Sequence, residues 1–118
     1  MIKVIVRRDE ARCITSFNMS GHAGYAEYGS DIVCAGASTL FYTAANALET
    51  ICRLSDTAVI KEDEETDFVQ GSIILPEIAD KEIKDRAQVI MATILTGYIS
   101  LASSVNEGGK RYIEIIET

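Results

Sequence analysis

The run of residues from Gly21 to Ser38 constrains this chain more than any other part of its sequence. It reads Gly-His-Ala-Gly-Tyr-Ala-Glu-Tyr-Gly-Ser-Asp-Ile-Val-Cys-Ala-Gly-Ala-Ser. Three glycines, Gly21, Gly24 and Gly29, permit backbone conformations that are closed to other residues, and small residues with helical character follow them. The run therefore predicts a mobile loop, hinged at its glycines, that leads into a helix.

Two reactive side chains lie in this run, the single histidine of the chain, His22, and Cys34. Cys34 falls at the expected start of the helix, where unpaired backbone N–H groups and the helix dipole favour a thiolate. An imidazole that folds back onto the thiol can take its proton and later protonate a leaving amine. The residue types thus allow a cysteine–histidine pair that needs no metal or other cofactor.

Each residue of this pair and its neighbours also has a structural explanation, and the sequence leaves both open. Cys34 could be a small buried apolar residue, and His22 a loop residue with a local hydrogen bond. Asp31 could orient His22 as a third member of the site, or cap the helix, which we favour. The N–H groups of Cys34 and Ala35 would provide an oxyanion hole. Ser38, one helical turn beyond Cys34, could hydrogen-bond within the site or face solvent.

Hydrophobic periodicity predicts the order ββαββαβ. Two hairpins of alternating residues each precede a helix with apolar positions spaced near 3.6, and a last strand follows the second helix. We expect an α+β fold, a two-layer sandwich with two helices on a mostly antiparallel sheet, in a single domain over residues 1–118. The predicted elements are Ile2–Arg8, Cys13–Met19, about Ile32–Arg53, Thr57–Asp63, Phe68–Leu75, Lys81–Val105 and Arg111–Glu117, with an acidic turn at Glu64–Asp67.

Charge and cysteine usage exclude several classes of function. The chain has 11 basic and 18 acidic residues, a net charge of −7, which argues against binding of nucleic acid or anionic membranes and suits a basic partner. We see no signal peptide and no apolar run approaching a membrane span, so we expect a cytoplasmic protein. Three cysteines without C-x-x-C spacing indicate neither a disulfide framework nor a metal site. We expect Cys13, in a strand, and Cys52, near the end of the first helix, to be packed in the core.

The run Gly21–Ala26, followed by Gly29 and Asp31–Ser38, closely resembles the signature of the bacterial ribosomal-processing cysteine protease (Prp) family. The length and the ββαββαβ order match as well, so the resemblance covers the whole chain. It implies a cysteine endopeptidase that removes the N-terminal extension of a basic large-subunit ribosomal protein, a step needed for ribosome assembly. By position, His22 matches the family's base, Cys34 its nucleophile, Gly21 a loop hinge and Ser38 an accessory residue. The resemblance also implies a homodimer.

Two other classes of function stay open from the residues alone. One is a non-catalytic ribosome-assembly or interaction module in which Cys34 is inert. The other is a thiol enzyme of different specificity, such as an acyltransferase or a redox sensor. The reactivity of the thiol separates the first class from the enzymes, and a defined peptide product separates a protease from the other thiol enzymes.

Overall fold

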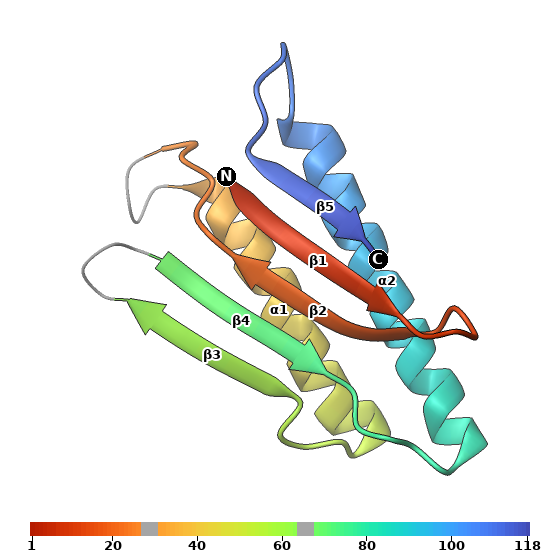
Figure 1. The fold of residues 1–118 in the computed structure, drawn as a ribbon. Helices are drawn as coiled ribbons and strands as arrows, with labels where there is room; N and C mark the ends of the chain where they lie inside the picture. The colour runs from red at the N-terminus through yellow and green to blue at the C-terminus, as the bar shows by residue number, and fades with distance from the viewer. Residues whose placement is uncertain (27–30, 64–67) are drawn as a thin grey trace.

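The computed structural model describes residues 1–26, 31–63 and 68–118. Within these ranges the elements follow the predicted ββαββαβ order and form an α+β fold (Figure 1). The predicted acidic turn Glu64–Asp67 lies outside the described residues. The elements are β1 (Ile2–Arg8), β2 (Ile14–Ser20), α1 (Ile32–Cys52), β3 (Ala58–Asp63), β4 (Phe68–Ile74), α2 (Lys81–Val105) and β5 (Ile113–Glu117).

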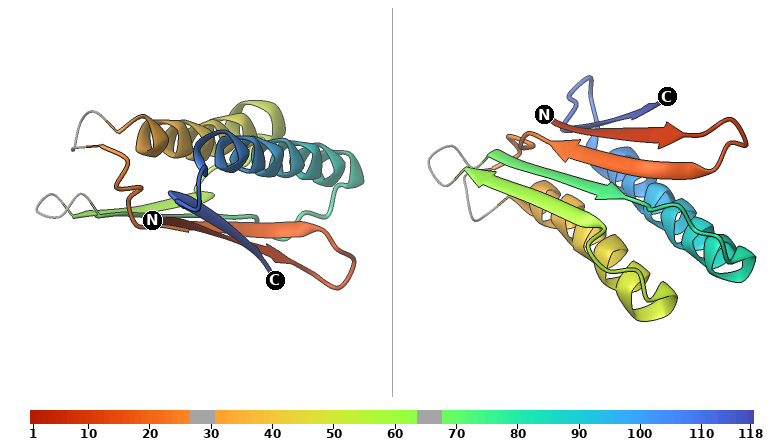
Figure 2. Two further views of the ribbon diagram at one scale, coloured as in Figure 1. Left: turned by 90° about the horizontal axis from the view of Figure 1, so that it is seen from above. Right: turned by 60° about the horizontal axis from the view of Figure 1, so that its bottom comes forward.

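The strands form one sheet in the order β3-β4-β2-β1-β5. The pairs β1–β2, β2–β4 and β3–β4 are antiparallel, which confirms the prediction of a mostly antiparallel sheet. The exception is the parallel pair of β1 and β5, in which Ile2 lies opposite Ile113. Both helices cover the same face of this sheet, so the molecule has two layers (Figure 2).

The core lies between the sheet and the two helices. Alternate residues of β1 point into it, as the period-2 pattern requires, and each fully buried aliphatic side chain contributes roughly 1.5–3 kcal/mol. Tyr98 of α2 is completely buried, and its hydroxyl donates to the carbonyl oxygen of Ala37 at 3.4 Å. Its ring meets that of Phe17 edge to face, with 6.0 Å between centroids. Tyr98 therefore ties α2 to both α1 and β2.

A glycine in β4 lets α1 approach the sheet closely. A Cβ placed on Gly71 would lie 2.6 Å from the Cζ atom of Phe41, a distance that real Cβ contacts do not reach. Phe41 is itself buried in the middle of α1. The absence of a side chain at Gly71 therefore fixes how closely the helix carrying Cys34 rests on β4.

The structure corrects one of the two cysteines assigned to the core. Cys52, the last residue of α1, is 2% exposed, as predicted. Cys13 instead lies one residue before β2, is half-buried and takes no part in the core, so its assignment is wrong. The preceding turn delays the strand, because Asp9 Oδ1 accepts the Cys13 N–H at 2.9 Å and Arg12 adopts a positive φ of 69°.

Helix α2 corrects a second expectation. By length and composition alone it could cross a membrane, although the sequence was expected to hold no such run. One stripe of its apolar residues packs against the sheet and α1, although Val89 and Ile99 stay exposed. The buried members of the stripe are Ala87, Met91, Ile94, Leu95 and Tyr98.

Candidate active site

Cys34 lies in the first turn of α1 and is half-buried. The backbone N–H of Ala23 donates to its Sγ atom, with 3.2 Å between nitrogen and sulfur. Ala23 is 5% exposed, so the segment just after His22 is folded against the cysteine. The sequence did not predict this contact, because a residue pattern does not show where a backbone N–H points.

Asp31 is the N-cap of α1, the role favoured from the sequence. Its Oδ1 atom accepts the N–H groups of Val33 and Cys34, both at 3.0 Å. Its Oδ2 atom accepts the N–H of Tyr25 at 3.0 Å and that of Ala26 at 3.4 Å. One carboxylate therefore holds the loop and the start of the helix together.

The charge on Asp31 affects the protonation of the neighbouring Cys34 thiol. Burial raises the pKa of the Asp31 carboxyl, but its four backbone N–H donors outweigh burial and leave that pKa below the ordinary value. The carboxylate is thus ionised at neutral pH. It places a negative charge beside Cys34 at the same helix end whose dipole would favour a thiolate.

The predicted preference of Cys34 for the thiolate is wrong in this structure. Burial raises the pKa of the Cys34 thiol above its ordinary value. The Ala23 N–H acts in the opposite direction, but the charge on Asp31 adds to the effect of burial. Cys34 is therefore a neutral thiol at neutral pH, and a base must come to it before it can act as a nucleophile.

His22 is exposed, two residues beyond the end of β2. Among the described residues, no hydrogen bond joins it to Cys34 or Asp31. The backbone on either side has positive φ, 90° at Gly21 and 67° at Gly24. The structure therefore presents the predicted pair apart, with His22 between two glycines that can adopt conformations other residues avoid.

Gly21 is restricted by space as well as by conformation. A Cβ at this position would lie 2.5 Å from the carbonyl oxygen of Met1. Gly21 follows β2 directly, so the loop begins pressed against the residue before β1. Gly24 has open space around it, and Gly29 lies outside the described residues. The hinge role of these glycines stays a prediction.

The two predicted oxyanion donors already have acceptors within the chain. The Cys34 N–H donates to Asp31 Oδ1, and the Ala35 N–H donates to the carbonyl oxygen of Asp31 at 3.1 Å. Neither is free to bind an oxyanion in this structure. Ser38 is half-buried one turn further along α1, and its accessory role stays a prediction.

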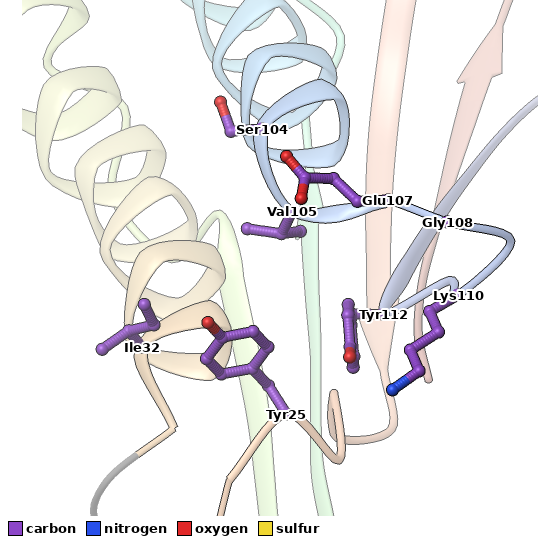
Figure 3. A pocket seen from close by; sticks show the side chains of 8 residues that line it. All are labelled: Tyr25, Ile32, Ser104, Val105, Glu107, Gly108, Lys110 and Tyr112. Carbon is purple, nitrogen blue, oxygen red and sulfur yellow. The ribbon is translucent and has the colours of Figure 1, made fainter.

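A pocket of about 560 Å³ opens beside this loop, where α1 begins and α2 ends (Figure 3). The rings of Tyr25 and Tyr112, both in its lining, touch each other edge to face, with centroids 5.1 Å apart. The sequence pattern did not predict this pocket, because its walls come from two distant stretches of the chain, 25–32 and 104–112. Its lining includes Tyr25, Ile32, Val105, Glu107, Lys110 and Tyr112.

Comparison with known proteins gives a consistent result. The pattern of the family described as "Cysteine protease Prp" matches residues 1–110. The ribosomal processing cysteine protease Prp of Bacillus subtilis is 34% identical over 91 residues, 77% of this chain and 78% of that protein. Its Staphylococcus aureus counterpart is 33% identical over 107 residues, 91% of this chain and 93% of that protein.

Solved structures resemble the whole chain. A crystal structure of the essential ribosomal processing protease Prp from S. aureus, in complex with a covalently linked product peptide, superposes with a TM-score of 0.74. It is 28% identical to this chain, and the match covers 100% of both chains.

Proposed function

The chain belongs to the Prp family of ribosomal processing cysteine proteases, and we propose that it removes the N-terminal extension of a large-subunit ribosomal protein. Cys34 is the nucleophile of this reaction and His22 the base. The observation that carries the proposal is the position of the Cys34 sulfur. It lies in the first turn of a capped helix and accepts a backbone N–H from the segment that carries His22.

The reaction begins with a movement of the segment from Gly21 to Gly24. Because burial and Asp31 raise the pKa of Cys34, the thiol needs a base close by, and the positive-φ glycines on both sides of His22 allow the imidazole to approach. His22 takes the thiol proton, and the sulfur attacks the carbonyl carbon of the scissile peptide bond. The imidazolium then protonates the leaving amine, and water hydrolyses the thioester that remains.

The tetrahedral intermediate needs donors for its oxyanion. The N–H groups of Cys34 and Ala35 are bound to Asp31, so they take this role only if the substrate displaces those contacts. The Ala23 N–H already points at the sulfur from 3.2 Å. It becomes available once the sulfur has bonded to carbon, and we assign it as an oxyanion donor.

The same proposal includes the partners and the compartment. A net charge of −7 favours a basic ribosomal protein as substrate. Family resemblance supports a homodimer and a cytoplasmic location. Exposed apolar side chains on the helices, Tyr42, Val89 and Ile99 among them, are compatible with a partner surface.

The test is incubation with the extended ribosomal protein, followed by mass analysis of the products. Wild-type protein should release one defined N-terminal peptide, and Cys34→Ala should release none. Cys13→Ala is the matched control, because Cys13 is a half-buried thiol at the opposite end of β2 from His22 and outside the core. Cleavage at the same bond by Cys34→Ala would overturn the assignment of the nucleophile.

The raised pKa of Cys34 also favours a second candidate, a non-catalytic module with an inert thiol. In that case wild-type protein releases no peptide, and substrate does not accelerate alkylation of Cys34. Alkylation that is faster with the ribosomal protein present would exclude this candidate, because an inert thiol gains no base on binding.

A further inference from the structure

The amino end of the chain lies beside the segment that carries His22. The antiparallel register of β1 and β2 pairs Lys3 with Ser20. Continued by two residues, the same register places Met1 opposite His22. Figure 1 shows the amino end next to the connection that leaves β2 for α1. The start of β1 is therefore a neighbour of the candidate active site, although it is distant from Cys34 in the sequence.

Packing and hydrogen bonding hold the amino end in this place. A Cβ added to Gly21 would lie 2.5 Å from the carbonyl oxygen of Met1 and 3.7 Å from the Cα atom of Ile2. The Ile2 side chain is 2% exposed, and the Ile2 N–H donates to the Tyr112 carbonyl oxygen at 2.9 Å. Met1 is thus attached to a fixed strand and packs against the residue that begins the loop.

Charges of opposite sign act on the Cys34 sulfur. Burial is the largest cause of the raised pKa of this thiol, and the negative charge of Asp31 adds to it. The Ala23 N–H and the positive charge of the N-terminal ammonium lower that pKa instead, because each favours the thiolate. The Asp31 carboxylate is needed where it is, since it caps α1 and holds the loop. The ammonium at Met1 thus supplies a positive charge that opposes Asp31 at the thiol.

We propose that, in a chain that begins at Met1, the α-ammonium group offsets the charge of Asp31 at Cys34, so that blocking the Met1 nitrogen lowers the reactivity of the nucleophile. The inference rests on the proposed function in taking Cys34 as the nucleophile. An acyl group on this nitrogen removes the positive charge, and residues placed before Met1 carry it away from the thiol. Met1 acts on the sulfur through its charge, so it is a positioning residue rather than a catalytic one.

Cys13 allows the charge to be changed at a single atom of the full chain. Native chemical ligation joins a synthetic Met1–Arg12 thioester to expressed residues 13–118 at this cysteine and leaves no foreign residue. Three versions are made, with a free, an acetylated or an N-methylated α-amine. The N-methylated version is the matched control, because it adds bulk to the same nitrogen and keeps the positive charge.

Alkylation measures the effect on the thiol without any substrate. Iodoacetamide labelling is followed against pH and resolved by peptide mass analysis. Acetylation should move the Cys34 profile to higher pH by on the order of half a unit, which is about threefold slower labelling at neutral pH. The N-methylated protein should keep the Cys34 profile of the free amine, and Cys13 should label alike in all three. High salt should shrink the difference, because it screens exposed charges.

Asp31→Asn tests whether the ammonium acts on the sulfur directly. This substitution removes the negative charge and should move the Cys34 profile to lower pH, opposite to acetylation. Acetylation should shift the profile of the Asn variant upward by the same amount as in wild type, because the ammonium and Cys34 interact through space. A shift confined to wild type would mean that the ammonium acts through the Asp31 carboxylate, which would overturn the direct effect.

The expressed chain offers a second route that needs no ligation. Two glycines placed before Met1 move the amine by up to about 7 Å and should reproduce the shift caused by acetylation. Lys3→Gln is the matched control, because it removes a positive charge from an exposed position of the same strand. It should leave the Cys34 profile unchanged.

Equal Cys34 profiles for the free and acetylated proteins would overturn the inference. So would an equal shift in the N-methylated protein, which would assign the effect to bulk rather than to charge. Either result leaves the endopeptidase proposal intact, because His22 can take the thiol proton without the ammonium. Absence of cleavage would overturn the proposed function and leave the labelling profiles interpretable, because they are measured without substrate.

Discussion

The two ends of α1 each carry a cysteine, and the two thiols show what does and does not make a reactive site. Burial raises the pKa of both Cys34 and Cys52, so neither thiol is ionised by its position in the helix alone. Cys52 is 2% exposed, and its thiol donates to the Ile83 carbonyl oxygen at 4.0 Å. Cys34 instead has a backbone donor on its sulfur and a charged cap beside it.

The ionisation of a thiol and its reactivity are separate properties in these two cysteines. The sign of the helix dipole differs between the two ends, yet the direction of the pKa shift is the same. What differs between the two thiols is which polar groups contact the sulfur and whether a base can reach it. In the proposed mechanism, reactivity at Cys34 therefore depends on groups brought to the thiol, above all His22, rather than on a thiolate formed in advance.

His22→Ala gives the largest expected change. Cleavage should fall by about 10²–10⁴-fold, because the thiol loses its base and the leaving amine loses its proton donor. The melting temperature should stay within a degree or two, since the side chain is exposed on a loop. Rates from product mass analysis and a thermal melt on the same sample check this. A rate within threefold of wild type would mean that another group deprotonates Cys34.

Asp31→Ala should destabilise the Cys34 end of α1 by about 0.5–2 kcal/mol, the usual cost of losing an N-cap. Because the pKa of Asp31 is lowered in the folded state, its contribution is present above its unfolded pKa of about 4 and is lost as pH falls through the folded value. Urea unfolding at pH 7 and at pH 2 should therefore show a smaller difference between wild type and variant at pH 2.

Asp31→Asn is the matched control for this measurement. An asparagine can still accept from Val33 and Cys34, but its amide nitrogen cannot accept from Tyr25 and Ala26. It should retain most of the cap and lose the pH dependence. An equal pH dependence in the Asn variant would assign it to another carboxyl group.

Cys52→Ala should show the reverse pattern from substitutions at the Cys34 end. Loss of a buried sulfur costs about 1 kcal/mol, which lowers the melting temperature by roughly 4 °C in a chain of this size. Cleavage below the melting range should be unchanged. Cys13→Ala, outside the core, should shift the melt by less than half as much. A larger loss from Cys13→Ala would contradict its position in the structure.

The smallest expected effect is a shift in the pH dependence of Cys34 alkylation, and it tests the pKa of this thiol directly. In free protein the rate should rise only above the pH at which an ordinary thiol reacts, because burial and Asp31 raise the pKa of Cys34. Asp31→Asn removes the charge and should move the profile to lower pH. Iodoacetamide labelling followed by peptide mass analysis resolves each cysteine. A Cys34 that labels fastest at pH 6 would contradict a raised pKa.

Most of the fold follows from local pattern. Alternation in Ile2–Arg8 and the 3.6-residue period of the helices depend on neighbours along the chain, and the structure confirms their bounds within a residue or two. The parallel pairing of β1 with β5 was not predicted, because it joins segments at opposite ends of the sequence. The start of β2 was misplaced by one residue because one side chain, Asp9, extends the turn.

The site was predictable in its residues but not in its electrostatics. The spacing of Asp31 and Cys34 indicates a cap, and the structure shows it. The same spacing does not show that the charge on Asp31 opposes the effect of the helix dipole on the pKa of Cys34, because that balance depends on burial and distance. The Ala23 donor and the pocket with Tyr112 depend on tertiary contacts, which a residue pattern does not contain.

The pairing of β1 with β5 also determines when the sheet can be completed during synthesis of the chain. β1 occupies an inner position in the sheet, yet its parallel neighbour is the last element of the chain. The hydrogen bond from the Ile2 N–H to the Tyr112 carbonyl oxygen can form only after Tyr112 has been synthesised. At about 5–20 residues per second, translation separates the two by roughly 5–20 s. The pocket wall at Tyr112 forms with that last strand, so a chain still being made has no complete pocket.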